Sequence, residues 1–423
     1  MIITVKENDT LFSLSQTYGV PESKIASDNG FSVNDSLVVG QNLIIRQQEI
    51  VYIPQNDTTV AEIARLYGTS TKQLFRNNYF LFGNENVPKD SYVVIEYKEN
   101  PAIEKIIGGY AYDFIDEGEL SRTINYLTYV MPFTYGFTGE GELIFADDEK
   151  ILNVAQNAGV KPIMHISTLT DEGVFDSNLP SFIFSDRAAR TNLIQNIIDV
   201  VNQKGYYGVD VDFEFLKADD AQNYVGFISA LADRLHSIGK ILIVALPPKT
   251  SREQRGLLYE GVDYYGLGQA ADYLLLMTYE WGYRFGPPLA IAPINQVRAV
   301  VEYALSEIDN SKLLLGISNY GYDWTLPYEK GLSDAPSISP VQAVDIARKY
   351  GAEIQFDEVS MAPFFEYQDE LSRRHIVWFE DAKSFRAKTD LIKEYDLAGG
   401  FVWELFRDNP SGFVTINREL VIK

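Results

Sequence analysis

Eight short apolar runs, mostly separated by amphipathic stretches, constrain the fold of this chain more than any other feature. They follow one another between residues 103 and 423, with helix-like stretches such as 221–238 and 293–308 between them. Apolar runs that alternate with helices are typical of parallel strands buried on both faces. Eight such units favour closure into a (β/α)8 barrel over an open, doubly wound sheet. The runs are 105–112, 126–133, 160–167, 208–215, 241–247, 273–281, 312–322 and 398–405.

The segment between the seventh and eighth runs is too long for a simple connecting helix. It contains a helix-like stretch at 340–350, and strand-like pieces lie around 355–365 and 375–379. Long connections inside compact domains usually have structure or function of their own. The sequence therefore predicts a small α+β insertion over about 325–380, beside the mouth of the barrel.

The fourth run places three acidic residues on one face of a strand. It reads GVDVDFE over 208–214, and because side chains alternate along a strand, Asp210, Asp212 and Glu214 point the same way. In a closed barrel that face is the lumen, where like charges raise one another's pKa. In a strand with only a structural role, nothing would offset the cost of burying these charges together. It suits an acid that must stay protonated near neutral pH, and Glu214 lies at the C-terminal end, where barrel active sites occur.

The spacing of the acidic residues narrows the chemistry. Asp212 and Glu214 are two residues apart, roughly 6.6 Å along a strand, so both can reach the same sugar from one side. Ordinary two-carboxylate glycosidases need acidic groups on opposite sides of the bond, and therefore from different strands. One acid with an adjacent orienting carboxylate fits the substrate-assisted exception.

The run YGVDVDFE at 207–214 resembles the DGxDxDxE signature of the family 18 glycoside hydrolases, a chitinase-like (β/α)8 family. Tyr207 replaces the first aspartate, and we expect this change to affect packing alone. The resemblance covers most of residues 103–423. It implies that a 2-acetamido group of the substrate is the nucleophile, so that hydrolysis proceeds with retention.

The resemblance also implies a role for each catalytic residue. Glu214 would protonate the glycosidic oxygen and then activate water. Asp212 would hydrogen-bond the acetamido N–H and balance the developing positive charge, with Asp210 supporting it. Tyr279 would donate its hydroxyl to the acetamido carbonyl.

Landmarks on later strands fit the same family. MTYE at 277–280 resembles its MxYD segment, with Glu280 in place of aspartate, and LLLGISNYGYDW resembles its seventh strand. GFVW at 400–403 resembles its eighth, whose tryptophan forms the floor of the sugar site. Core packing is the alternative for Trp403, for Tyr279 and for about half of the aromatic residues on the first two strands. The expected substrate-binding residues are Trp403, Met277, Glu280, Tyr110, Tyr112, Phe133 and Tyr320.

An internal repeat occupies the first 97 residues. Residues 3–29 and 52–78 align at one offset, which pairs Thr10 with Thr59 and Tyr18 with Tyr67. Each unit predicts a strand, two short helices and a closing strand. The pattern resembles the LysM module, a binder of N-acetylglucosamine-containing glycans, over units 1–48 and 49–97. The polar stretch KENPA then links them to the barrel domain, 103–423.

The resemblance implies where each unit would hold a glycan. In the family, the glycan lies between the loop before the first helix and the loop before the last strand. The first unit is the closer match. The alternative is that these residues only cap helices. The expected contacts are Asn8, Asp9, Thr10 and Leu11 in the first unit, and Asp57, Thr58, Thr59 and Val60 in the second.

The formal net charge of −23 limits the partners of the chain. It argues against nucleic acid and disfavours anionic membranes and strongly anionic polymers, whereas neutral sugars fit. The N-terminal residues show no signal peptide, and no run of 18 apolar residues predicts a membrane span. Cysteine is absent and the three histidines are far apart in sequence, so we expect no thiolate chemistry, metal or cofactor. We also expect the protein to be a monomer.

Two LysM-like units before a family-18-type domain, without a signal peptide, resemble the spore cortex-lytic N-acetylglucosaminidases of Bacillus-type bacteria. The segment HIVWFEDAKSF at 375–385 is also similar to that group. The resemblance implies a spore (coat or cortex) enzyme that cleaves β-1,4 bonds after N-acetylglucosamine in cortex peptidoglycan during germination. Alternatives are a chitinase or other endo-β-N-acetylglucosaminidase, and a non-catalytic chitinase-like glycan-binding protein. The last is disfavoured because such proteins usually lack the acid, and Glu214 is present.

Overall fold

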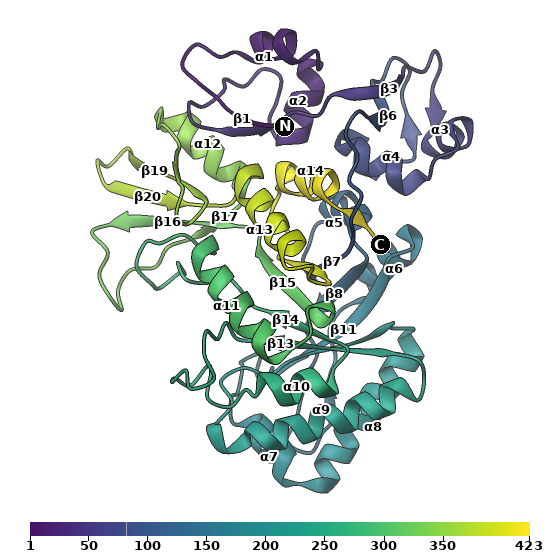
Figure 1. Cartoon of the computed structure of the whole chain (residues 1–423), viewed down its shortest axis with the longest axis vertical. Coiled ribbons are helices and arrows are strands. Elements are labelled where there is room, and N and C mark those ends of the chain that lie inside the picture. Colours follow the sequence, from purple (N-terminus) through teal and green to yellow (C-terminus); the bar gives the residue numbers. More distant parts are fainter. Residues whose placement is uncertain (82) are drawn as a thin grey trace.

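A closed barrel of eight parallel strands forms the centre of the computed structural model, which describes residues 1–81 and 83–423 (Figure 1). The strands follow the order β7, β8, β11, β12, β13, β14, β15 and β21, and β21 pairs with β7 to close the ring. This confirms the (β/α)8 prediction over the open sheet. The barrel strands are β7 Glu104–Tyr112, β8 Tyr129–Phe133, β11 Lys161–Ser167, β12 Gly208–Asp212, β13 Ile241–Leu246, β14 Tyr273–Leu276, β15 Leu313–Ser318 and β21 Gly399–Trp403.

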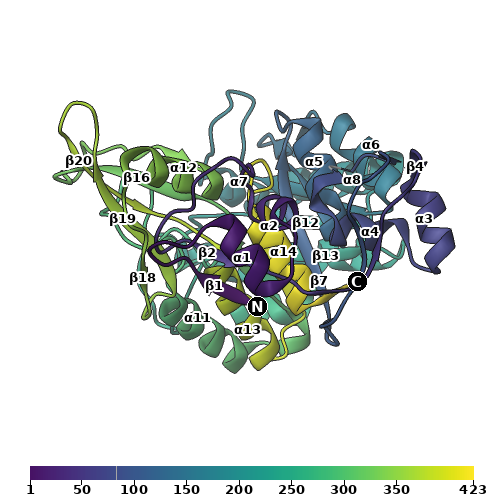
Figure 2. The same ribbon diagram turned by 90° about the horizontal axis from the view of Figure 1, so that it is seen from above.

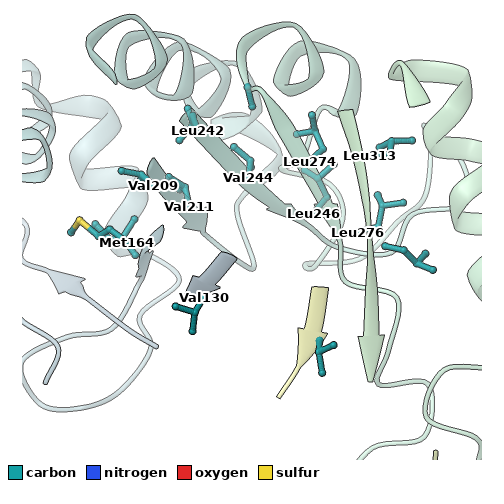
Figure 3. Packing of buried hydrophobic residues seen from close by; sticks show 14 of the residues in the cluster. Val130, Met164, Val209, Val211, Leu242, Val244, Leu246, Leu274, Leu276 and Leu313 are labelled. Carbon is teal, nitrogen blue, oxygen red and sulfur yellow. The ribbon is translucent and has the colours of Figure 1, made fainter. Parts of the chain in front are cut away.

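The barrel strands bury both of their faces. Side chains such as Val209, Val211 and Leu242 point outward and pack in the core between strands and helices (Figure 3). Alternate side chains, including Ile163 and Ile243, fill the interior of the barrel. Because Val209 and Val211 face the helices, the alternation of the strand places Asp210 inside the barrel.

Helices surround the barrel, and capping residues mark both ends of the longest one that the structure describes. The longest begins after Asp186, whose carboxylate accepts the N–H groups of Ala188 and Ala189, and ends at Gly205 with φ of 74°. The helices are α5 Glu117–Thr123, α6 Glu149–Ala158, α7 Leu179–Ser185, α8 Arg187–Lys204, α9 Ala221–His236, α10 Tyr264–Ala270, α11 Ile294–Glu307, α13 Ala382–Glu394 and α14 Pro410–Glu419; the short strands β9 Gly136–Phe137, β10 Leu143–Ile144 and β22 Val421–Ile422 lie among them.

The predicted insertion is a five-stranded antiparallel sheet with one helix packed against it, at the left of Figure 1. The sheet order is β17, β16, β20, β19 and β18. It begins at Gly321, before the predicted start near residue 325, because the strand after β15 already belongs to this sheet. Its elements are β16 Gly321–Leu326, β17 Ser337–Ile338, α12 Pro340–Tyr350, β18 Gln355–Asp357, β19 Ala362–Gln368 and β20 Arg374–Trp378.

The N-terminal repeat forms two small modules. Thr10 and Thr59 occupy equivalent positions, since each caps its first helix with a reciprocal capping box. Gly19 and Gly68 end these helices in the left-handed conformation, with φ of 66° and 67°. The first module contains β1 Ile2–Thr4, α1 Leu11–Tyr18, α2 Glu22–Asn29 and β2 Asn42–Ile44; the second contains β3 Gln48–Tyr52, β4 Thr58–Thr59, α3 Val60–Tyr67, α4 Thr71–Asn77, β5 Asn86–Val87 and β6 Val93–Tyr97.

Both modules pack directly on the barrel domain, as Figures 1 and 2 show. In the first module, Val38 joins an apolar cluster of the insertion, and Val39 accepts the N–H of Ile354 at 3.0 Å. In the second, Arg76 donates to the carbonyl of Asn125 at 2.6 Å. The sequence identified the modules but gave no indication of this docking. Of the helices described, none is long and apolar enough to cross a membrane.

Candidate active site

A cavity of about 470 Å³ opens at the C-terminal ends of the barrel strands. It brings together predicted residues from five different strands or the turns that follow them. Both polar and aromatic side chains form its wall, as expected for a site that binds sugar. The lining residues are Tyr110, Tyr112, Phe133, Ser167, Thr168, Phe175, Ser177, Asp212, Glu214, Phe215, Met277, Tyr279, Glu280 and Trp403.

The acidic residues form a column that leads into this cavity. Asp210 is fully buried on β12, Asp212 is the last residue of that strand, and Glu214 lies in the turn that follows. That turn contains Phe215 with φ of 56°, a left-handed conformation. Asp210 Oδ2 accepts the hydroxyl of Tyr110 at 2.9 Å and lies 2.7 Å from His165 Nδ1. The deepest carboxylate is therefore held by side chains from two other strands, β7 and β11.

Burial makes the carboxyl groups of Asp212 and Glu214 weaker acids than they are in water. Desolvation raises the pKa of Asp212 well above its usual value, and the charges of Glu214 and Asp210 add to the effect, while His165 opposes it. Desolvation also raises the pKa of Glu214, followed by the charge of Glu280. A glutamic acid that keeps its proton beside a bound sugar is the group that general acid catalysis requires.

Tyr279 and Trp403 form a parallel pair at one side of the cavity. Their ring centroids are 6.4 Å apart and their planes differ by 17°. Burial first, and then the charge of Asp212, raise the pKa of the Tyr279 hydroxyl, so this group remains a hydrogen-bond donor. Trp403 is also braced by the rings of Tyr110 at 5.2 Å and Phe133 at 5.1 Å. The cavity thus has a rigid aromatic surface.

Glu280 lies on the cavity wall, and two tyrosines hold it there. The hydroxyls of Tyr320 and Tyr322 both donate to Glu280 Oε1, the latter at 3.1 Å. Tyr320 is 3% exposed and does not line the cavity. The structure therefore differs from the expected direct contact of Tyr320 with substrate and makes it a support for Glu280. Glu280 itself has a left-handed backbone, with φ of 68°.

Tyr207, the departure from the family signature, lies at the opposite end of β12 from Glu214. Its ring stacks on Tyr129 with centroids 5.7 Å apart, and Lys161 Nζ lies 4.2 Å from its centre. This is the packing role that we expect for the substitution.

Several residues of the site are absent from the sequence-based prediction. His165 could have been found, because Ile163 faces the barrel interior and alternation then turns His165 the same way. Ser167 and Thr168 lie at the end of the same strand and just beyond it. Phe175, Ser177 and Phe215 come from loops, where no periodicity indicates which side chains turn toward the cavity.

The expected glycan-contact residues of the modules lie at the start of the first helix in each. Thr10 and Thr59 cap these helices, and Asp9 and Asp57 accept backbone N–H groups of Lys6 and Lys89. The side chains of Leu11 and Val60 are 6% and 1% exposed within the module cores, so any glycan contact there falls to the backbone. Asn8 has φ of 69°, and Thr58 donates to Glu62.

No group of three or more histidine, cysteine or acidic side chains suited to a metal ion occurs within residues 1–81 and 83–423.

A (β/α)8 barrel with an acidic column on its fourth strand, ending in a buried glutamic acid at the mouth, defines a glycoside hydrolase. Comparison with models of protein families supports the same class of enzyme. Residues 107–408 match the model of glycosyl hydrolases family 18, and residues 3–46 match that of the LysM domain. The chain therefore belongs to glycoside hydrolase family 18.

Two relatives are similar to the chain over nearly its full length. The chain is 34% identical to the cortical fragment-lytic enzyme of Bacillus subtilis (strain 168), over 98% of this chain and 97% of that protein. It superposes on the spore cortex-lytic enzyme SleL of Bacillus megaterium QM B1551 with a TM-score of 0.85 at 33% identity, covering 100% of this chain and 98% of that one. A chitinase from Chromobacterium violaceum, 24% identical, shares the barrel fold over 74% of this chain and 98% of its own, with a TM-score of 0.69.

Proposed function

We propose that this protein is an N-acetylglucosaminidase of spore cortex peptidoglycan that cleaves the β-1,4 bond after N-acetylglucosamine. The full-length similarity to cortical fragment-lytic enzymes supports the substrate. The acidic column supports the chemistry, because Asp210, Asp212 and Glu214 all come from one strand and the turn that follows it. Carboxyl groups on one side of a sugar suit an acid and its helper better than an acid and an opposing nucleophile.

The first step of the proposed reaction uses the raised pKa of Glu214. Its carboxylic acid protonates the glycosidic oxygen as the bond to the anomeric carbon breaks. The acetamido oxygen of the same sugar attacks that carbon and forms a cyclic oxazolinium ion. Asp212 accepts the acetamido N–H and balances the positive charge, while the Tyr279 hydroxyl donates to the acetamido oxygen.

The second step returns the site to its starting state. Glu214, now a carboxylate, takes a proton from a water molecule that opens the ring from the face left by the leaving group. Two displacements at one carbon give net retention of configuration. Trp403 stacks on the apolar face of the sugar throughout, and the aromatic rings around it keep that surface rigid.

The two modules suit a polymer that contains N-acetylglucosamine. We propose that they hold the enzyme on its glycan, with the first module as the stronger site. An enzyme that is held on cortex glycan in this way would reside in the spore coat or cortex. The acidic surface is less of an obstacle on cortex than on ordinary cell wall, because cortex carries fewer peptide carboxylates.

Product analysis tests the assignment of the substrate. Purified cortex glycan strands are digested, and the new ends are identified by mass spectrometry. We expect N-acetylglucosamine at the new reducing end. Muramic acid at that end would make the protein a muramidase and overturn the proposal. Chitin oligomers cleaved faster than cortex fragments would favour the chitinase alternative.

A Glu214→Gln variant tests the assignment of the acid. General acid–base catalysis contributes about 10²- to 10⁴-fold, so we expect kcat on cortex fragments to fall by at least 100-fold. Glu253→Gln is the matched control, because Glu253 is exposed and outside the cavity. Wild-type turnover by Glu214→Gln would show that another group supplies the proton.

A further inference from the structure

His165 is fully buried between two members of the acidic column. Its Nδ1 lies 2.7 Å from Asp210 Oδ2, and its Nε2 lies 3.9 Å from Asp212 Oδ2. The imidazole stacks on Phe133 with centroids 4.8 Å apart and meets the Tyr110 ring edge-on at 5.2 Å. These two rings fix the plane of the imidazole, so both nitrogen atoms keep their orientation toward the carboxyl groups.

The hydrogen-bond partners determine which nitrogen carries the proton. Asp210 Oδ2 already accepts the Tyr110 hydroxyl at 2.9 Å, so it acts as a carboxylate acceptor and Nδ1–H donates to it. In a neutral imidazole the other nitrogen must then be an acceptor. Nε2 is buried without a hydrogen-bond partner among the residues that the structure describes, and the buried Asp212 Oδ1 is likewise unpartnered. A small side-chain rotation of Asp212 would bring the two groups into contact.

The proposed reaction requires a group that accepts the proton of Asp212. Burial, followed by the charges of Glu214 and Asp210, raises the pKa of Asp212 against the opposing effect of His165, which favours the protonated carboxyl group in the resting site. The substrate needs Asp212 as a carboxylate, because the acetamido N–H requires an acceptor and the oxazolinium ion requires a counter-charge. The proton must therefore leave Asp212 for an internal base or for solvent.

We propose that His165 is a positioning residue that takes the proton of Asp212 when substrate occupies the cavity, an inference that rests on the proposed function. The O–H bond of Asp212 breaks, an N–H bond forms at Nε2, and the imidazolium is held by the Asp210 carboxylate. Two neutral groups become a carboxylate–imidazolium pair, so the net charge of the cavity does not change. Asp212 gains its negative charge without losing a proton to bulk water.

The groups around His165 fit this role. From β7 it meets the hydroxyl-bearing Tyr110, and from β8 the uncharged Phe133. From β12 it meets Asp210 and Asp212; among residues 1–81 and 83–423, its ring and ion-pair contacts include no cation that would oppose the formation of an imidazolium. Glu214 bears on this pair from the mouth of the cavity, because its charge adds to the desolvation that raises the pKa of Asp212.

A His165→Asn variant separates the two hydrogen bonds. The carboxamide N–H can replace Nδ1–H and keep Asp210 in place, but nothing in asparagine reaches the position of Nε2. We expect kcat to fall roughly 100-fold on cortex glycan fragments, with KM changed less than about threefold, as for loss of a proton acceptor. The acid limb of kcat/KM should move to higher pH, because Asp212 must then lose its proton to solvent. His236→Asn, at an exposed histidine paired with Asp272, is the matched control and should match wild type.

Histidine NMR gives a second measurement that does not depend on turnover. Wild-type protein labelled with ¹⁵N-histidine is compared free and bound to a thiazoline analogue of the oxazolinium ion. We expect His165 to be neutral when free and protonated on both nitrogens when bound. A neutral His165 in the complex, or a His165→Asn variant with wild-type kcat and pH profile, would overturn the inference. Failure of the thiazoline to bind would instead refute the substrate-assisted mechanism, and this inference would fall with it.

Discussion

Replacing Lys24 by methionine should release the two modules from each other. Lys24 on α2 is 3% exposed and forms a buried ion pair with Asp28. Its ammonium group also donates to the carbonyl of Asn77 in the second module at 3.0 Å. Tyr97 donates to the same carbonyl at 2.9 Å, and Arg46 lies 3.6 Å from the Tyr97 ring centre. The junction between the modules is therefore a buried charged cluster.

The size of the effect follows from what remains after the substitution. Removing one partner of a buried ion pair costs about 3–5 kcal/mol, because the other charge stays buried. Desolvation raises the pKa of Asp28, but the charge of Arg46 still opposes that shift after the substitution, so the carboxylate is partly compensated. We therefore expect the lower end, about 3 kcal/mol. The carbonyl of Asn77 keeps its bond from Tyr97 and adds no further loss.

Native-state hydrogen exchange measures this local free energy. Amides of α2 and α4 should exchange roughly 150-fold faster in Lys24→Met, since each 1.36 kcal/mol corresponds to a factor of ten. Amides of β13 in the barrel, such as that of Ile243, should be unchanged. The double variant Lys24→Met/Asp28→Leu should return to within about 1 kcal/mol of wild type, because both charges are then absent. A single-variant effect under about 0.5 kcal/mol would refute a buried, docked junction.

Three further changes probe the cavity and the docking of the first module. Glu280→Gln removes the charge that helps raise the pKa of Glu214, so the pKa falls and the basic limb of kcat/KM, which reports protonated Glu214, should move to lower pH. Tyr110→Phe removes one donor to the buried Asp210 carboxylate; a loss of about 1.5–3 kcal/mol should appear as a lower Tm and a tenfold or greater fall in kcat. Gly40→Ala would place a Cβ 1.7 Å from the Ile354 carbonyl at φ of 85°, so the first module should detach, with faster exchange at the Ile354 amide and unchanged kcat on short soluble oligosaccharides.

The barrel and its acidic column were predictable because both depend on local periodicity. A buried parallel strand shows itself as an apolar run, and alternation then decides which side chains face inward. The same rule applied to β11 would have placed His165 inside the barrel beside Asp210. Because His165 is far from the other two histidines in sequence, only its place in the strand, and no cluster of ligands, indicates this position. Residues that reach the cavity from loops, such as Phe175 and Phe215, follow no period.

The docking of the modules was not predictable, because it depends on contacts between segments far apart in sequence. Val39 and Ile354 are joined by a single backbone hydrogen bond, and Asn42 donates to Asp381 at 2.7 Å. Neither pair has a signature that one sequence could reveal. The polar stretch at 98–102 is typical of a flexible linker, yet the elements on either side of it are held together by buried contacts. Composition indicates where a chain can bend and does not exclude tertiary packing across the bend.

The insertion connects the first module to the wall of the cavity through one hydrogen-bonded sheet. Tyr322 on β16 donates to Glu280 on the cavity wall, and Ile354, next to β18, donates to Val39 of the module. Allosteric coupling between two ligand sites requires an element with two arrangements, and both ligands must shift the balance between them. A hydrogen-bonded sheet of this kind instead holds the two sites at a fixed distance. The proposed glycan site of the module can therefore raise the local concentration of polymer at the cavity without altering the chemistry there. It follows that loss of docking should weaken action on long cortex strands while turnover of short oligosaccharides, which occupy the cavity alone, stays the same.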